Sequence, residues 1–269
     1  MLKHLKYFGR VLAENFAYSE VNHYFAPTEK YPIMSFNIRR DAVEDADCNW
    51  KHRKHLCAKV MRRADIVCLQ EVMPHMAKYL KAQMGDTYDM YSADSLLHVR
   101  LDRNPIIFTE GLVIFYNRAK YRLVVADVLP MSKMRWSKGF LSPRIALRVV
   151  LEDKDTHELT TVFNTHLCHK SSESRKASAE QLALFAAAAK GNVFVAGDFN
   201  CWYNAPELKP LNDTLHHNVK KTATYVGFRG EKDKIIDMIY SDIAYKTKAI
   251  AVTRNGRNIS DHHAIVLTD

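Results

Sequence analysis

The sequence predicts an α/β protein with one main domain over residues 31–269, and three observations support this. From Tyr31 onward, short apolar runs typical of buried strands alternate with longer stretches that have helical periodicity. The length of 269 residues suits one large α/β domain. No Gly- or Ser-rich linker, internal repeat or low-complexity tract divides the chain.

Residues 1–30 precede the first strand and form a predicted N-terminal extension. Apolar residues fall near helical spacing there, with basic residues beside them: Leu2, Leu5, Leu12 and Phe16, then Lys3, Lys6 and Arg10. We expect a short helix packed on the main domain, because Glu14 and Glu20 dilute the basic face. A targeting or membrane-surface helix is the alternative.

The first half of the main domain predicts two strand–helix units followed by a loop. In chain order they are a strand over 33–38, a helix over 50–63, a strand over 65–69, a helix over 74–84 and a loop over 92–110. Pro74 suits the first turn of its helix, and Gly85 follows the helix end. Asn104-Pro105 favours the loop, which we expect near the active site.

The second half predicts further strands around one long helix. The strands are expected over 112–116, 145–151, 159–167, 192–196, 235–240 and 264–267. Strong helix formers, including the run Ala186–Ala189, predict a helix over 172–189. Gly191 follows that helix as a stop.

Composition and charge restrict the class of protein. Hydrophobic residues make up 47% of the chain and charged residues 26%, which excludes the disordered, collagen-like and disulfide-scaffold classes. The 39 Lys and Arg outnumber the 30 Asp and Glu, so the formal net charge is +9. Such an excess attracts polyanions and makes nucleic acid a plausible partner. A basic protein without such a partner is an equally open alternative.

Cysteine spacing and apolar runs indicate the cellular setting. No pair has C-x-x-C spacing, so the cysteines predict free thiols in a reducing compartment: Cys48, Cys57, Cys68, Cys168 and Cys201. No run approaches the ~20 apolar residues of a membrane span, and basic residues interrupt the first ten positions, where a secretory signal would begin. We therefore expect a soluble, intracellular (cytoplasmic) monomer without a transmembrane segment.

Acidic and amide residues stand at the ends of the predicted strands, far apart in sequence. Asn37, Gln70-Glu71 and the segment Gly197-Asp198-Phe199-Asn200 each lie at or directly after a strand. Asp237 lies within an apolar run, and Asp261-His262 precedes the last strand. Carboxylates beside apolar runs are costly to desolvate unless they are paired or bind a cation. Oxygen ligands of this kind suit Mg²⁺.

These segments resemble the motifs of the endonuclease/exonuclease/phosphatase superfamily, which includes the DNase I-like enzymes. The matching segments, in the order of the family, are Ser35–Ile38, Leu69–Val72, Asn164–Leu167, Gly197–Asn200, Ile236–Tyr240 and Ser260–His262. Further segments resemble a bacterial subgroup: Asn49-Trp50, Arg53-Lys54, Ser142–Ala146 and Thr224–Gly230. The resemblance implies a four-layer α/β/β/α sandwich, with two packed mixed β-sheets flanked by helices, as the fold of a catalytic domain over 31–269.

The resemblance also implies a metal site and a set of catalytic residues. Glu71 is expected to be the main ligand of Mg²⁺ or Mn²⁺, with Asn37 and Asp261 beside it. Asp198 is expected to activate the attacking water, Asn200 and Arg144 to bind phosphate, and His166 to lie near a phosphate oxygen. Asp237 is expected to pair with His262 and fix its tautomer. For Asp198 an Asx turn is the alternative, and for His166 a buried core histidine. His169 matches no motif, and we interpret it as a surface or core residue.

These roles predict a metal-dependent hydrolase of phosphate esters, and foremost a nuclease or phosphodiesterase that cleaves DNA or RNA. The net charge favours that substrate, as does the aromatic Trp136 between Arg135 and Lys138, which can stack on a base. A phosphatase or phosphodiesterase acting on a small sugar, lipid or nucleotide phosphate is the second hypothesis. A catalytically inactive family member that binds nucleic acid is the third.

Overall fold

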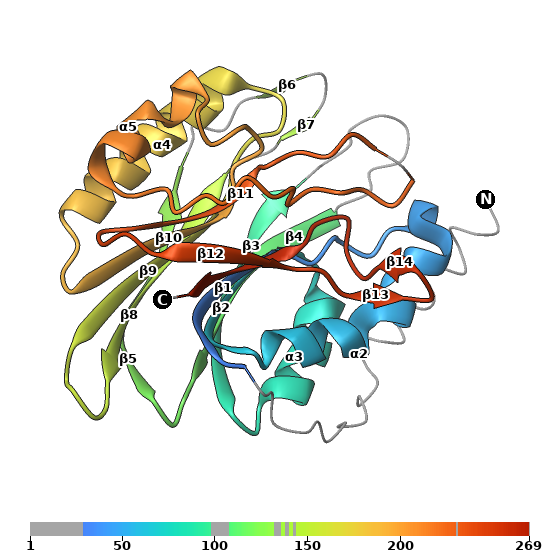
Figure 1. Ribbon diagram of the computed structural model, residues 1–269, viewed down its shortest axis with the longest axis horizontal. Coiled ribbons are helices and arrows are strands. Elements are labelled where there is room, and N and C mark those ends of the chain that lie inside the picture. The colour runs from blue at the N-terminus through green and yellow to red at the C-terminus, as the bar shows by residue number, and fades with distance from the viewer. Residues whose placement is uncertain are drawn as a thin grey trace.

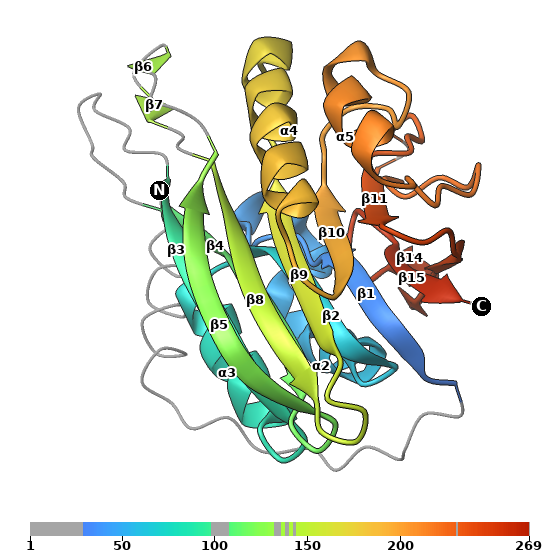
Figure 2. The ribbon, with the colours of Figure 1, turned by 90° about the vertical axis from the view of Figure 1, so that its left-hand side faces the viewer.

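Two β-sheets pack face to face in the computed structural model, and helices cover the outer face of each sheet (Figures 1 and 2). The structure describes residues 29–97, 108–131, 136–137, 140–141, 144–229 and 231–268. This arrangement is the four-layer α/β/β/α sandwich that the sequence resemblance implied, and it confirms the predicted fold class.

The first sheet has six strands and brings three of the predicted site segments to the same end of the sheet, where its central strands finish. Its order is β12 (Lys246–Ile250), β15 (Ala264–Thr268), β1 (Tyr31–Asn37), β2 (Ala64–Val72), β4 (Phe108–Asn117) and β3 (Tyr88–Leu97). Strands β1 and β2 are parallel, so Asn37 at the end of β1 lies beside Gln70 near the end of β2. Strand β15 runs antiparallel to β1, so the segment before β15, with Asp261 and His262, lies at the same end of the sheet as Asn37.

The second sheet has five strands and does the same for the remaining segments. Its order is β11 (Asp237–Ser241), β10 (Asn192–Asp198), β9 (Leu159–His166), β8 (Ile145–Asp153) and β5 (Tyr121–Pro130). Strand β10 is parallel to β9 and antiparallel to β11. Asp198 is therefore the register partner of both His166 and Asp237, three residues that lie far apart in sequence.

Helices close the sandwich on both sides. The six-stranded sheet is covered by α2 (Trp50–Met61) and α3 (Pro74–Met84), and the five-stranded sheet by α4 (Ser172–Ala187) and α5 (Lys209–Thr214) (Figure 2). Ser171 caps α4 by accepting a hydrogen bond from the Ser174 amide at 3.1 Å. Smaller elements complete the description: the 3₁₀ helices η1 (Val43–Cys48) and η2 (Pro206–Leu208), and the pairs β6 (Trp136–Ser137) with β7 (Phe140–Leu141) and β13 (Thr253–Arg254) with β14 (Arg257–Asn258).

The core has three apolar layers because successive residues of a strand face opposite sides. In β2, Val67 and Leu69 pack against α2 and α3, whereas Ile66 and Cys68 pack against the other sheet. Strands buried on both faces read as continuous apolar runs, which is why the run over 65–69 was readable as a strand.

One polar contact crosses the central layer directly below the strand ends. Asn164 on β9 donates hydrogen bonds to the carbonyls of Leu69 at 2.9 Å and Val113 at 3.0 Å. Its own carbonyl oxygen accepts from the Gln70 side-chain amide at 2.8 Å. All of these groups are buried, so the hydrogen bonds fix how one sheet sits on the other.

Most of the predicted elements are confirmed, and the differences have identifiable causes. The three predicted helices correspond to α2, α3 and α4. The predicted loop over 92–110 is wrong at both ends, because β3 continues to Leu97 and β4 begins at Phe108. Strand β3 lies at the sheet edge, where a strand keeps polar residues and loses the continuous apolar signal. Strands β5 and β12 and helix α5 were not predicted.

Some sequence predictions lie outside the described residues. They are the helix within residues 1–28, the segment with Asn104-Pro105, the Trp136 side chain and the motif residues Ser142-Pro143. The N-terminal extension over 1–30 and the catalytic domain over 31–269 therefore stay predictions. Among the described residues, no helix is long and apolar enough to span a membrane.

Candidate active site

The strand ends of both sheets surround a cavity of about 350 Å³. Seven of the nine predicted site residues line it: Glu71, Arg144, His166, Asp198, Asn200, Asp261 and His262. The other two, Asn37 and Asp237, lie directly behind the cavity wall and are hydrogen-bonded to residues that line it. The structure thus brings all nine predicted side chains together.

Glu71 reaches the cavity because β2 is irregular at its end. Between Leu69 and Val72 the register with β4 shifts, as at a β-bulge, and Glu71 has a φ of 60°. A bulge changes the direction of a side chain, and a positive φ outside glycine is characteristic of functional sites. Gln70 can therefore point between the sheets while Glu71 lies against the cavity.

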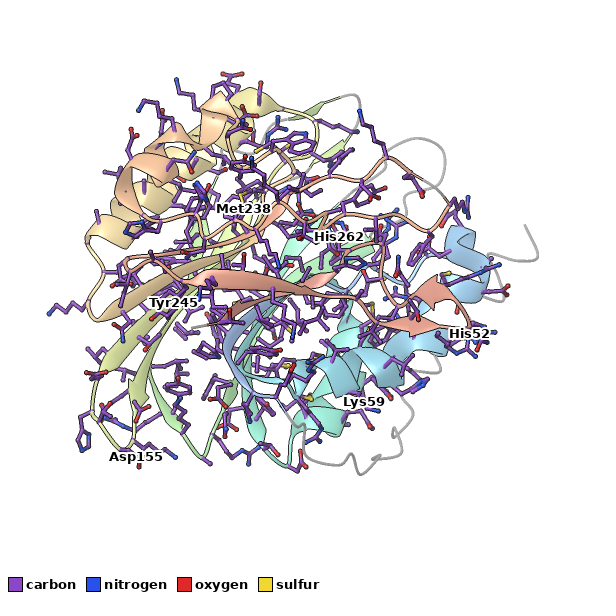
Figure 3. All side chains as sticks on the ribbon, viewed as in Figure 1. His52, Lys59, Asp155, Met238, Tyr245 and His262 are labelled. Atoms are coloured by element: carbon purple, nitrogen blue, oxygen red, sulfur yellow. The ribbon has the colours of Figure 1, made fainter. Side chains whose placement is uncertain are left out.

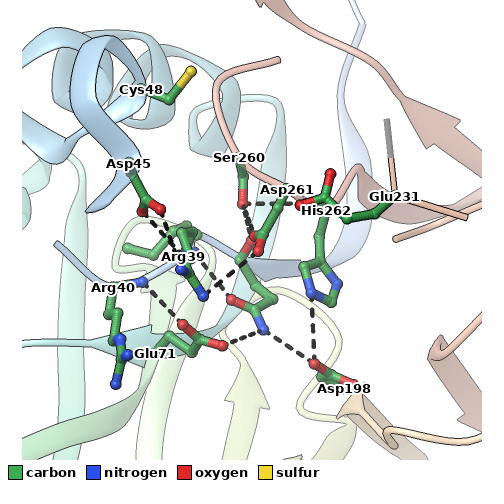
Figure 4. Close-up of polar contacts among 12 residues, drawn as sticks. Arg39, Arg40, Asp45, Cys48, Glu71, Asp198, Glu231, Ser260, Asp261 and His262 are labelled. Carbon is green, nitrogen blue, oxygen red and sulfur yellow. Dashed lines mark hydrogen bonds and ion pairs between the residues drawn. The ribbon is translucent and has the colours of Figure 1, made fainter. Parts of the chain in front are cut away.

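The Glu71 carboxylate is held in its charged form. Its two oxygens accept hydrogen bonds from the Asn37 amide at 3.2 Å and the Arg40 backbone N–H at 3.0 Å (Figure 4). Burial raises the pKa of Glu71, but the nearby His166 and Arg39 side chains lower it more, to about 2. A charged, partly buried carboxylate is a suitable ligand for a hard cation.

Asp261 is a second carboxylate near Glu71, whereas Asn37 turns its amide nitrogen toward Glu71 and Asp198. The Asn37 carbonyl oxygen accepts from the Arg39 backbone N–H at 3.0 Å. Asp261 lies 3.7 Å from the Arg39 guanidinium and accepts from the Ser260 hydroxyl at 3.3 Å. The two carboxylates fit Mg²⁺ or Mn²⁺, which takes few protein ligands and keeps several waters, and Asn37 joins them as a ligand only if its amide turns over. The donor set therefore fits a divalent metal.

Asp198 lies at the centre of the site, between the two sheets. One of its oxygens accepts from the Asn37 amide at 3.0 Å and lies 3.6 Å from the His166 Nε2. Its other oxygen accepts from the Asn200 backbone N–H at 2.8 Å. That second contact is the Asx turn considered as an alternative, but it occupies only one oxygen. Burial and the nearby Asp237 raise the pKa of Asp198 to about 7.

His262 and Asp237 form the predicted pair. The His262 Nδ1 lies 2.8 Å from an Asp237 oxygen, and its Nε2 lies 3.8 Å from Asp198. Burial lowers the pKa of His262, but Asp237 and Asp198 raise it more, to about 10. The imidazole is therefore a cation near neutral pH. The Tyr225 ring packs edge-on against it, with ring centroids 5.1 Å apart.

Asp198, Asp237 and His262 also satisfy the geometry of a metal site, with one ligand atom of each within 4.8 Å of the others. A metal needs a neutral imidazole as ligand, so a metal bound by His262 would displace the proton that Asp237 and Asp198 hold there. The cavity therefore offers two candidate metal positions, one at Glu71 and one at this cluster.

The remaining predicted residues line the same cavity. Arg144, directly before β8, is buried in the cavity wall. Together with burial, it lowers the pKa of His166 well below the ordinary value, so His166 is neutral. Asn200 has a φ of 54° and donates to the Leu167 carbonyl at 3.0 Å. Gly197 serves packing instead, because a Cβ there would lie 2.1 Å from the Thr165 carbonyl oxygen.

Several cavity residues were not found from the sequence: Arg39, Arg40, Glu110, His169, Tyr225 and Lys234. His169 is exposed, as expected of a surface residue, and it also lines the cavity. Glu110 lies on β4 near Glu71, and burial together with the Glu71 charge raises its pKa to about 7. The pair Arg39-Arg40, two residues after Asn37, was a usable signal, whereas Lys234 and Tyr225 come together through a β-bridge between loops.

Beneath the metal side of the cavity, Arg53 of α2 is buried, with 2% of its surface exposed. Its guanidinium donates to backbone carbonyls of three separate segments: Ile38, Arg39 and Arg40; Cys48; and Ile259. The first segment follows Asn37 and carries the N–H that binds Glu71, and the third precedes Asp261. Arg53 therefore joins the backbones that hold the candidate metal ligands.

The cavity lies at the strand ends of an α/β/β/α sandwich and joins a carboxylate cluster, an acid–imidazole pair and a buried arginine. Together, this fold and this set of side chains define a class of phosphate-ester hydrolases. The family comparison agrees. The model of the endonuclease/exonuclease/phosphatase family matches residues 34–262, and the chain belongs to this family. The family includes nucleases, phosphatases and phosphodiesterases that generally use divalent metals. No curated protein matches the chain.

Solved structures show the same fold at low sequence identity. An endonuclease/exonuclease/phosphatase from Bacteroides vulgatus is 24% identical, with a TM-score of 0.73 over 88% of this chain and 97% of that one. A mannosyl-6-phosphatase from Bacteroides thetaiotaomicron is 21% identical, with a TM-score of 0.68 over 88% and 98%. TDP2 from D. rerio, solved with a single-strand DNA product, is 16% identical, with a TM-score of 0.66 over 87% and 96%.

Proposed function

We propose that the protein is a Mg²⁺-dependent phosphodiesterase that cleaves nucleic acid by in-line attack of water. The observation that carries this proposal is the position of Asp198. It shares Asn37 with Glu71 on one side and faces the His262 imidazole on the other. A base, a cation site and a cationic imidazole thus surround one cavity, and these are the groups that phosphodiester hydrolysis needs.

Each residue has a role that follows from its surroundings. Glu71, Asn37 and Asp261 would hold Mg²⁺, which supplies charge neutralisation on a phosphate oxygen. Asp198, with its pKa raised to about 7, accepts the proton of the attacking water near neutral pH. His262, held charged by Asp237, donates to a phosphate oxygen as negative charge develops. Arg144, His166 and Asn200 support the remaining oxygens.

The second candidate function is hydrolysis of a small phosphomonoester. The solved structure titled mannosyl-6-phosphatase is as similar in fold as the one solved with single-strand DNA product. One assay with Mg²⁺ separates the two: plasmid DNA, single-stranded RNA and a set of phosphomonoesters are compared at equal enzyme concentration. Faster turnover of a phosphomonoester than of either polymer would favour the second function.

Substitution Glu71→Gln tests the metal assignment. It keeps the shape of the side chain and removes the charge, so Mg²⁺-dependent turnover should fall at least ~10²-fold while the melting temperature stays near that of wild type. Turnover and Mn²⁺ binding by calorimetry are measured together, with excess chelator on wild type as a second condition. Full activity of the variant, or of wild type in chelator, would contradict the assignment.

A further inference from the structure

Beside the active-site cavity lies a second cavity of about 380 Å³, between η1, the start of α2 and the β13–β14 hairpin. We call it the hairpin groove. Its ionisable side chains are His52 on α2, Arg254 and Arg257 on the hairpin, the buried Arg53 at its base and Asp47 on η1. Figure 3 labels His52 beside the hairpin strands.

The groove is strongly basic. Arg254 and Arg257 are register partners across the hairpin, and directly paired residues put their side chains on the same face. His55 on α2 lies close enough to Arg254 that burial and this arginine lower its pKa. The acidic lining residue, Asp47, lies 3.6 Å from Arg257, but both side chains are more than half exposed, so the pair is weak. Arg257 can therefore exchange Asp47 for another anion.

Two chain segments connect the groove to the active site. Asn258 lines the groove and Asp261 lines the active-site cavity, and three residues of chain span at most ~11 Å. Asp47 and Cys48 of η1 line the groove, while Asp45 of the same element binds Arg39 in the active site. Figure 4 shows Cys48 on the far side of Asp45 from Glu71.

We propose that the hairpin groove binds the phosphate backbone of a nucleic-acid strand whose scissile phosphate lies in the active site. This inference rests on the proposed function. A nucleic-acid strand carries a phosphate at every nucleotide, so a short strand can place one phosphate in the active site and another in the groove. Forked guanidinium groups bind phosphate oxygens well. A small phosphate ester fills the active-site cavity alone and leaves the groove empty.

The test compares two variants with equal changes of charge. Arg254→Gln combined with Arg257→Gln removes two charges from the groove. Lys176→Gln combined with Lys209→Gln removes two exposed charges from α4 and α5, which cover the other sheet (Figure 1). Each protein is assayed with Mg²⁺ on labelled single-stranded and duplex oligonucleotides and on bis(p-nitrophenyl) phosphate, and oligonucleotide affinity is followed against salt.

At low salt, the groove variant should cleave oligonucleotide about tenfold more slowly. This loss is the low end of the increase in association rate that a cluster of like charges gives to an oppositely charged substrate. Its log–log salt slope should fall by roughly 1.4 on single strands or 1.8 on duplex, for two lost contacts. Its turnover of bis(p-nitrophenyl) phosphate and the behaviour of the control variant should match wild type.

Three results would overturn the inference: equal losses on oligonucleotide and on bis(p-nitrophenyl) phosphate, no loss on either, or the same loss in the control variant. A wild-type protein that hydrolyses bis(p-nitrophenyl) phosphate but binds no oligonucleotide overturns both the groove and the nuclease assignment, and leaves the ester hydrolase. A wild-type protein that hydrolyses neither substrate overturns the proposed function itself.

Discussion

Asp198 is the residue whose substitution distinguishes catalysis from structure most sharply. Its oxygens contact the Asn37 amide and the Asn200 backbone N–H, and it faces both His166 and His262. In Asp198→Asn the side-chain carbonyl can still accept from Asn200, so the turn survives. The proton acceptor is lost, and turnover should fall ~10²–10⁴-fold.

Turnover and melting temperature of Asp198→Asn are measured side by side to separate these roles. A purely structural Asp198 would give the opposite pattern, with near-normal turnover and a lowered melting temperature. That pattern would remove the base from the proposed mechanism.

Asp237 and His262 should act as one unit. Because the carboxylate holds the imidazole at 2.8 Å and keeps it charged, removing either side chain removes the same transition-state contact. Each single alanine variant should lose much of the rate, and the double variant should lose little more. The measurement is a double-mutant cycle on kcat/KM. Losses that multiply independently would show that the two residues do not work as a pair.

At the scale of single elements, strand ends and their irregularities place the chemistry. Gln70 faces the other sheet by the same alternation as Ile66 and Cys68, and the bulge of β2 turns Glu71 toward the cavity. The backbone after β1 is held by Arg53 of α2, which reaches carbonyls of three segments. A helix that covers the outer face of the sheet thus also supports the candidate metal ligands from below.

Substitution Arg53→Lys tests this support. Lysine keeps the charge but lacks the planar fork, so several buried carbonyls lose their donor. The free energy of unfolding should fall by about 2–4 kcal/mol, from roughly 1–3 kcal/mol for each unsatisfied group, and Mn²⁺ binding should weaken several-fold. Denaturant unfolding and calorimetry measure the two effects. Lys51→Met, at an exposed position of the same helix, is the control, and equal behaviour of the two variants would exclude the supporting role.

At the scale of the whole molecule, the site exists only where the two sheets meet. Glu71, Asn37 and Asp261 come from the six-stranded sheet and its adjoining segment, whereas Asp198 and Asp237 come from the five-stranded sheet. A shift of one sheet over the other would separate the metal side from the base. The buried hydrogen bonds of Asn164 with Gln70, Leu69 and Val113 oppose such a shift.

Substitution Asn164→Ala should weaken the packing of the sheets. Two buried carbonyls and the Gln70 amide lose a partner, so we expect a loss of roughly 2–4 kcal/mol in the free energy of unfolding. For a domain of this size that lowers the melting temperature by about 4–16 °C. Calorimetry measures the shift, with Ser92→Ala at an exposed position of β3 as the control. A shift no larger than that of the control would show that the amide contact is dispensable.

The sequence by itself determined the fold class, the three main helices, most central strands and the nine side chains that gather at the candidate site. Central strands buried on both faces give continuous apolar runs, and the candidate catalytic segments are short motifs with their polar residues next to one another. Asn37, Gln70-Glu71 and Asp198 could therefore be recognised at strand ends.

Only the tertiary structure decided what those segments meet. Edge strands β3, β5 and β12 have half-exposed faces, so their apolar signal is weak. Glu110 is an ordinary residue until the antiparallel pairing of β2 with β4 brings it near Glu71. The charge of His262 and the raised pKa of Asp198 depend on burial and on neighbours from other strands. Burial and long-range pairing are properties of the folded chain, and no local pattern contains them.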